Sequence, residues 1–306
     1  MRYYKLIIDG KHFASLTKEN PDAPRVEFNF VSYAGAEVPN ARIKIYNLSR
    51  QFFQAMDKMV GKKLEFYAGL SQESAMLKKA GYIQPALDLI GAGYIQSVIA
   101  NPNAVPSSVE FILGVSPIKK QDEEGSAKGI IFEVGVGDTL KDALKTALTQ
   151  LYSGVFVEIE GLPIVATQEE KIVFYSFSEL LARAEKSKIA IFKTTRGYKI
   201  TDEGKADKQE TKLRLIDFLE QPHSIGLNKI QCALNLRGDL QINSLITIEG
   251  KIFATLGENA QFVANVPKVL VMGSYRITKL WHSGDSRNLN YQGWATNIEA
   301  VSWVGV

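Results

Sequence analysis

The chain has 306 residues, of which 45% are hydrophobic and 23% charged, and its formal net charge is +3. This composition is typical of soluble globular proteins with two or three domains, and it excludes wholesale disorder and fibrous repeats. The near-neutral charge argues against a nucleic-acid-binding domain. No window approaches about 18 consecutive apolar residues, and residues 1–9 become polar too soon for a signal peptide. We therefore expect synthesis in the cytoplasm and no stable membrane insertion.

The first block, residues 1–117, is predicted to consist of short strands separated by turns, which is typical of a small β-barrel. Its clearest strand lies within residues 40–49. There, Ala41, Ile43 and Ile45 alternate with a second set, Arg42, Lys44 and Tyr46. The second set is the candidate functional face, exposed to solvent, to a lumen or to an interface. Other strands are predicted over Tyr3–Ile8, Arg25–Phe30, Lys63–Ala68, Gly93–Ala100 and Ser108–Leu113.

Two features interrupt these strands. The stripe of Phe52, Phe53, Met56 and Met59 predicts a short helix over Ser49–Met59, and we interpret the stripe as core packing at one end of the barrel. Residues 71–92 predict an extended hairpin inserted between two strands. The glycines of Gly91–Tyr94 predict a turn, because neither Lys-Ser nor Lys-Thr follows them as in a phosphate loop.

The middle of the chain, residues 118–205, is predicted to be a compact α+β domain. An amphipathic helix is predicted over Asp138–Leu151, with Asp138 or Thr139 as its cap. Ser176 and Glu179 have capping-box spacing, so a second helix is predicted after Ser176, followed by the strands Ile189–Thr194 and Tyr198–Thr201.

The last block, residues 206–306, returns to short strands after a polar linker at 206–212. Strands are predicted over Leu227–Leu234, Leu245–Ile248, Gln261–Val266, Gly273–Trp281 and Gly293–Val301. The predicted fold class is therefore α+β and mainly β, with two related antiparallel β-barrel domains flanking a central α+β domain. A divergent duplication would explain why the two ends are alike, although no clean repeat is visible.

Residues with catalytic or ligating potential do not form a recognisable motif. His12, His223 and His282 lack zinc-site spacing, and Cys232 in an apolar run is interpreted as a buried small residue. We expect no catalytic, cofactor or metal site. The acidic pairs are interpreted as solvated turns: Glu123-Glu124, Glu158 with Glu160, and Glu169-Glu170. Most C-terminal aromatics are interpreted as core residues, with a sugar or base platform as the alternative: Tyr275, Trp281, Tyr291, Trp294 and Trp303.

Several segments together resemble one family. Residues 40–49, the helix after them, Lys63–Gly69 and Gly93–Ser97 look like the N-terminal barrel of baseplate hub proteins from contractile-tailed bacteriophages. Gly238-Asp239, the run Gly273–Asp285 and Trp294–Ala300 resemble the closing strands of the same proteins, where a tyrosine-led strand precedes a polar His-Gly-Asp-type turn.

The resemblance implies a structural protein of the virion tail baseplate, not an enzyme. Such a hub is a ring-shaped homotrimer whose two barrels per subunit match a sixfold tail tube, or tube-initiator protein, to a threefold central spike. The ring would meet baseplate wedge components outside and leave a channel for the tape-measure protein and for DNA in transit. Two alternatives remain open: a tail-associated cell-wall hydrolase or carbohydrate-binding tail protein, suggested by the acidic pairs and aromatics, and a nucleic-acid-binding barrel, suggested by Lys62-Lys63 and Lys119-Lys120.

Overall fold

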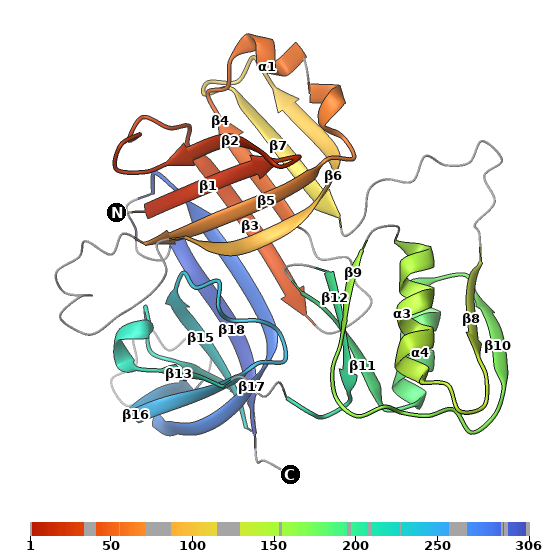
Figure 1. Cartoon of the computed structure of the whole chain (residues 1–306). Coiled ribbons are helices and arrows are strands. Elements are labelled where there is room, and N and C mark those ends of the chain that lie inside the picture. Colours follow the sequence, from red (N-terminus) through yellow and green to blue (C-terminus); the bar gives the residue numbers. More distant parts are fainter. Residues whose placement is uncertain are drawn as a thin grey trace.

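Figure 1 shows three groups of elements: an N-terminal β block at the top, a C-terminal β block below it, and a central α+β unit to the right of the C-terminal block. The computed structural model describes residues 2–33, 41–54, 56–70, 87–114, 129–152, 155–194, 197–206, 210–226, 228–256, 268–288, 290 and 293–303. The chain is mainly β with few helices among these residues, which agrees with the mainly β part of the predicted class.

The N-terminal block contains all of the strands predicted for it, together with one that was missed. The strands are β1 (Arg2–Ile8), β2 (Lys11–Leu16), β3 (Val26–Tyr33), β4 (Ala41–Tyr46), β5 (Lys63–Leu70), β6 (Asp88–Asn101) and β7 (Ser108–Gly114). The predicted helix after β4 is found as α1 (Arg50–Gln54) and a 3-10 turn, η1 (Met56–Met59). Its Phe52, Phe53, Met56 and Met59 are partly buried against the core of this block, as the stripe indicates.

Strand β6 begins earlier than predicted. Residues 71–86 of the predicted hairpin insertion lie outside the described residues, whereas Asp88–Ala92 already belong to the strand. The predicted turn at Gly91 is wrong. A Cβ at position 91 would lie 2.2 Å from the Phe30 ring, so the glycine allows an aromatic ring to pack directly on the strand.

The C-terminal block contains β13 (Glu210–Leu213), η2 (Leu215–Asp217), β14 (His223–Gly226), β15 (Lys229–Asn235), β16 (Leu245–Leu256), β17 (Lys268–Asp285) and β18 (Trp294–Ser302). The strand predicted over 261–266 lies outside the described residues. The predicted turn at His282–Asp285 is wrong, because these residues form the end of β17. They continue as a strand because they pair with a new partner, β3 of the N-terminal block.

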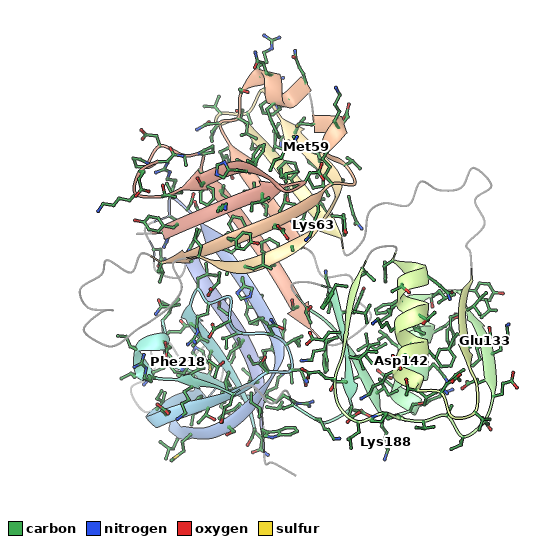
Figure 2. All side chains as sticks on the ribbon, in the orientation of Figure 1. Met59, Lys63, Glu133, Asp142, Lys188 and Phe218 are labelled. Carbon is green, nitrogen blue, oxygen red and sulfur yellow. The ribbon has the colours of Figure 1, made fainter. Side chains whose placement is uncertain are left out.

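This β17–β3 pairing makes the strands of both blocks one sheet. The sheet has 13 strands in the order β13-β16-β14-β15-β18-β17-β3-β4-β7-β6-β5-β1-β2, and most of its pairs are antiparallel. Three clusters of buried side chains accompany it, one for each group of elements. Figure 2 shows side chains filling the interior of each group. Leu236 and Trp294 of the C-terminal block belong to the N-terminal cluster, so the two β blocks share core packing.

The central unit places two helices between two small sheets (Figure 1). One sheet contains β8 (Ile130–Val134) and β10 (Glu170–Phe174), and the other has the order β11 (Ile189–Lys193), β12 (Gly197–Asp202) and β9 (Phe156–Ile159). Helix α3 (Leu140–Leu151) is capped by Thr139, and α4 (Phe177–Lys186) is capped by Ser176, whose hydroxyl accepts from the amide of Glu179. Both predicted helices are thus confirmed with their caps.

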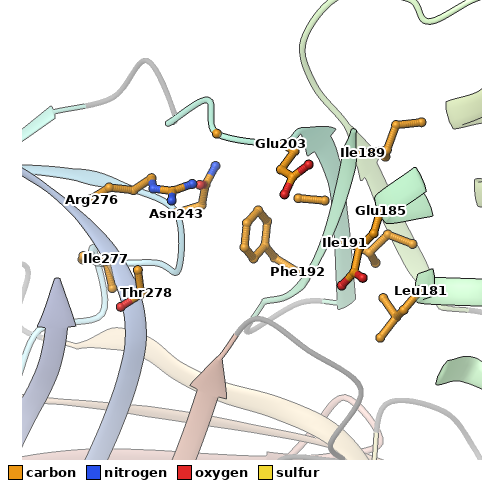
Figure 3. A pocket seen from close by; sticks show the side chains of 12 residues that line it. Leu181, Glu185, Ile189, Ile191, Phe192, Glu203, Asn243, Arg276, Ile277 and Thr278 are labelled. Atoms are coloured by element: carbon orange, nitrogen blue, oxygen red, sulfur yellow. The ribbon is translucent and has the colours of Figure 1, made fainter. Parts of the chain in front are cut away.

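The seam between the central unit and the C-terminal block forms an open pocket of about 330 Å³. Figure 3 shows Phe192 of β11 on one side of it, and Asn243 and Arg276 on the other. The Phe192 side chain is buried although it belongs to none of the three core clusters, so it packs at this seam.

Candidate functional site

Strand β4 positions the face predicted from the sequence. Ala41, Ile43 and Ile45 are buried on one side of the strand, whereas Arg42 is exposed and Lys44 is half-buried on the other. The alternation therefore holds for Arg42 and Lys44. Tyr46 differs, since only 9% of its surface is exposed.

The face extends beyond β4 in both directions because register partners share a side of the sheet. Lys44 is paired with Glu27 of β3 and Glu110 of β7, and Glu27 is in turn paired with Asp285 of β17. We call the resulting surface the polar sheet face. Its polar side chains and one tryptophan are Lys229, Gln231, Asn297, Glu299, Lys279, Trp281, Ser283, Asp285, Glu27, Asn29, Arg42, Lys44 and Glu110. The half-buried Val31, Ile112 and Val301 share this side of the sheet.

Opposite charges on this face neutralise one another. Arg42 Nη1 lies 3.6 Å from the carboxylate of Glu110. The Arg25 guanidinium, at the edge of the face, reaches Glu27 at 2.5 Å and Asp285 at 2.7 Å. These pairs are partly exposed, so each contributes little to stability. Their larger effect is to leave a hydrated surface with little net charge.

The C-terminal half of the face repeats this arrangement. The Glu299 carboxylate lies 2.6 Å from Lys229 Nζ and 3.3 Å from Lys279 Nζ. Burial alone would raise the pKa of Glu299, but the two lysines outweigh burial and lower it. Lys279 Nζ also lies 5.1 Å from the ring centroid of Trp281. A cation therefore lies over this aromatic ring.

Tyr46 packs beneath cations. The Arg25 guanidinium is 4.7 Å and Lys44 Nζ is 5.1 Å from the centroid of its ring. Burial is the main reason that the pKa of Tyr46 is raised. Sequence reasoning missed Arg25 and Asp285 as members of this site. They are 260 positions apart, and no local pattern indicates that they meet.

Cys232 and His282, two further candidates from the sequence, are buried in the protein interior. Cys232 is fully buried, as predicted, and burial raises the pKa of its thiol. His282 is buried as well, with Nδ1 2.9 Å from the hydroxyl of Thr296, and burial lowers its pKa to about 4. No group of three or more potential metal ligands is found within the described residues. No helix within the part of the chain that the structure describes is long and apolar enough to cross a membrane.

The prediction of solvated turns holds for part of the acidic pairs: Glu169 is exposed outside the strands and Glu158 is exposed on β9, whereas Glu160 and Glu170 are paired with basic side chains. Glu160 pairs with Lys199 at 2.8 Å, and Glu170 accepts from Arg183 Nε at 2.8 Å. The pair Glu123-Glu124 lies outside the described residues. Glu160 and Glu170 therefore serve ion pairs of the central unit.

The C-terminal aromatics divide between core and surface. Trp294 and Tyr275 are buried, as the core interpretation predicts. Trp281 and Trp303 are half-buried, and a cation lies over each ring, Lys279 and Arg276 respectively. Tyr291 lies outside the described residues. The structure does not bring these side chains together as one platform.

Solved structures share this arrangement over nearly the whole chain. The 43 kDa tail protein of prophage MuSo2 from Shewanella oneidensis aligns with a TM-score of 0.55 at 12% identity, covering 99% of this chain and 97% of that one. A tail protein from Neisseria meningitidis MC58 aligns with a TM-score of 0.53 at 8% identity, covering 98% and 96%.

The chain has the fold of phage tail proteins. A third match is the E. coli c3393 protein, a type VI secretion component described as structurally similar to the T4 tail proteins gp27 and gp5. It aligns with a TM-score of 0.52 at 10% identity, covering 98% of this chain and 77% of that one. No protein-family model matches the sequence, and no curated protein matches it. At these identities the likeness concerns the fold.

Proposed function

We propose that this chain is the baseplate hub protein of a contractile-tailed phage or a related injection machine, a structural protein without enzymatic activity. The observation that carries the proposal is the near-complete, two-way coverage with two phage tail proteins, which includes both β blocks and the central unit. A fold shared over full length in both chains favours a shared architectural role over a borrowed domain.

The proposed assembly is a homotrimeric ring in which each subunit contributes two related barrel-like domains, residues 1–117 and 206–306, flanking a central domain at 118–205. The pairings support the C-terminal barrel, because each of β14, β15, β16, β17 and β18 pairs with two others of the five. A closed ring needs heterologous contacts, and two similar blocks per chain let one contact type recur around the axis. The ring would join the tail tube or its initiator protein to the central spike.

The polar sheet face supports a channel wall in this proposal. Arg42 and Lys44 would face the channel and Tyr46 would support them from beneath. Because the charges of the face are paired within it, a passing tape-measure protein or DNA would meet hydrated groups and little net positive charge to retain it. The central unit would lie outside, next to baseplate wedge components.

The test is the mass of the chain in solution together with its shape in negative-stain electron micrographs. The expected result is a ring of about 102 kDa, three times the 33.9 kDa of one chain. The measurement includes the tube and spike proteins encoded by the same phage or prophage, because assembly can require them. A chain that stays monomeric alone and with both partners contradicts the proposal.

A further inference from the structure

A polar cavity of about 360 Å³ opens where the two β blocks meet, beside the polar sheet face. It is lined by Asp22, Ala23, Pro24, Arg25, Tyr46, Asn47, Pro106 and Arg287. These residues come from the loop before β3, the end of β4, the loop before β7 and the turn after β17. Segments from the beginning and the end of the chain therefore build the cavity jointly.

Arg287 is held in place by groups that leave its charge unpaired. Its Nη2 donates to the carbonyl oxygens of Pro21 at 2.9 Å and Ala23 at 2.7 Å. Its own backbone amide donates to Asp285 Oδ1 at 3.0 Å. No carboxylate among the described residues lies within salt-bridge distance of the guanidinium, and Nε and Nη1 have no hydrogen-bond partner among them. An arginine fixed by neutral carbonyls keeps its full charge and a free edge for a ligand.

Arg25 and Asn47 add further donors. Arg25 uses Nε and Nη2 for Asp285 and Glu27, which leaves Nη1 without a hydrogen-bond partner among the described residues. The Asn47 side chain likewise has no partner there. One acidic side chain, Asp22, lines the cavity, and like Arg287 and Asn47 it is exposed. The donors that the described residues leave unused are therefore Nε and Nη1 of Arg287, Nη1 of Arg25 and the amide of Asn47, and the two arginines are held by the hydrogen bonds of their other nitrogens.

We propose that this cavity, which we call the seam pocket, binds an oxyanion between Arg287, Arg25 and Asn47. Planar guanidinium groups recognise carboxylates and phosphates through paired N–H donors, and the volume suits a carboxylate side chain or a phosphate ion. A carboxylate on a neighbouring tail protein is the expected physiological source, and that part rests on the proposed function. A free anion such as inorganic phosphate offers the same chemistry.

The test follows arginine Nε–H signals by NMR in the ¹⁵N-arginine-labelled full chain during separate titrations. The probes are inorganic phosphate and two short blocked peptides that differ only in carrying one Glu or one Gln. Arg287→Gln removes the proposed ligand group, and Arg42→Gln is the matched control, an exposed arginine outside the pocket. Thermal unfolding of both variants confirms that they are folded.

The expected result is a saturable shift of the Arg287 signal with the Glu peptide, with phosphate or with both, and none with the Gln peptide. Followed through the Arg25 Nε–H signal, which both variants keep, binding should weaken at least tenfold in Arg287→Gln and stay unchanged in Arg42→Gln. A response to phosphate alone assigns the pocket to a free anion, and a response to the Glu peptide alone assigns it to a protein carboxylate. No saturable response, or an equal response in Arg287→Gln, overturns the proposal.

The mass of Arg287→Gln in solution separates this proposal from the hub function. Lost anion binding with an intact ring leaves the hub proposal standing and shows that the pocket does not hold the ring together. A chain that binds the anion yet never forms a ring contradicts only the hub proposal.

Discussion

Lys141 carries the most stringent stability prediction because its ammonium group is enclosed within the central unit. Only 2% of its side chain is exposed, and Nζ lies 2.5 Å from Asp202 Oδ1. Nζ also donates to the carbonyl oxygens of Glu160 at 2.5 Å and Leu162 at 2.9 Å. The pair therefore joins α3 to β12 and to the turn after β9.

The perturbation is Lys141→Met, which keeps an unbranched side chain of similar length and removes the charge. Breaking a buried ion pair from one side costs about 3–5 kcal/mol. Asp202 keeps Lys205 at 2.7 Å and the amide of Leu162 at 3.3 Å, so we expect the lower end, about 3 kcal/mol. Lys171→Met is the matched control, because Lys171 pairs with Glu133 at 3.0 Å but is 62% exposed.

The assay is amide hydrogen exchange by mass spectrometry, which reports the opening of each unit separately in a multi-domain chain. A loss of about 3 kcal/mol corresponds to roughly 100-fold faster exchange in peptides of α3 and β12, with no change in the β blocks. Lys171→Met should leave these rates nearly unchanged. Equal effects of the two substitutions, or less than a tenfold change in Lys141→Met, refute the reasoning.

Acid provides a second readout of the same pair. Burial would raise the pKa of Asp202, but donors from Lys141, Lys205 and the Leu162 amide outweigh burial and lower the pKa from 3.8 to about 2. Because the carboxyl is more acidic in the folded chain, the pair stabilises the fold above about pH 4, and this contribution is lost as the pH falls toward 2. The loss is about 2 kcal/mol, and it should be smaller in Lys141→Met.

Three further predictions concern the β blocks. Burial lowers the pKa of His282 from 6.5 to about 4. As the pH falls, the unfolded chain therefore takes up this proton first, and the free energy of unfolding should fall by about 3 kcal/mol between pH 6.5 and 4. Denaturant titrations of wild type and His282→Gln check this, and an unchanged pH dependence in the variant contradicts it. Gly91→Ala should displace the Phe30 ring and lower the free energy of unfolding by about 1–3 kcal/mol, measured by the same titrations. An alanine variant as stable as wild type would show that the ring has room for the added methyl group. The double reversal Arg42→Glu/Lys44→Glu should leave the ring mass unchanged, because in the proposed assembly this face lines the channel. A monomeric product would place the face at a subunit interface instead.

Local features of the fold could be predicted from the sequence. The alternation in β4, the stripe of α3 and the Ser176 cap of α4 depend on residues within one or two turns of each other, and all are found. The continuous sheet could not be predicted. It depends on β17 exchanging partners along its length, from β16 at Lys268–Arg276 to β3 at Lys279–Asp285.

The candidate site shows the same limit. Arg42 and Lys44 follow from strand periodicity, whereas the burial of Tyr46 follows from Arg25, which is held by Asp285. Likewise, Lys141 lies within an amphipathic helix where its charge suggests a solvated position, yet it is buried because Asp202 from a distant strand receives it. Charges that are buried by partners remote in sequence leave no local signal.

A cryo-electron microscopy reconstruction of the chain assembled with its tube and spike partners is the most direct test of the hub account. The account predicts three copies around one axis, with the two β blocks of each copy alternating around a pore and the polar sheet face lining it. A different copy number, or β blocks that enclose no common pore, would contradict the account.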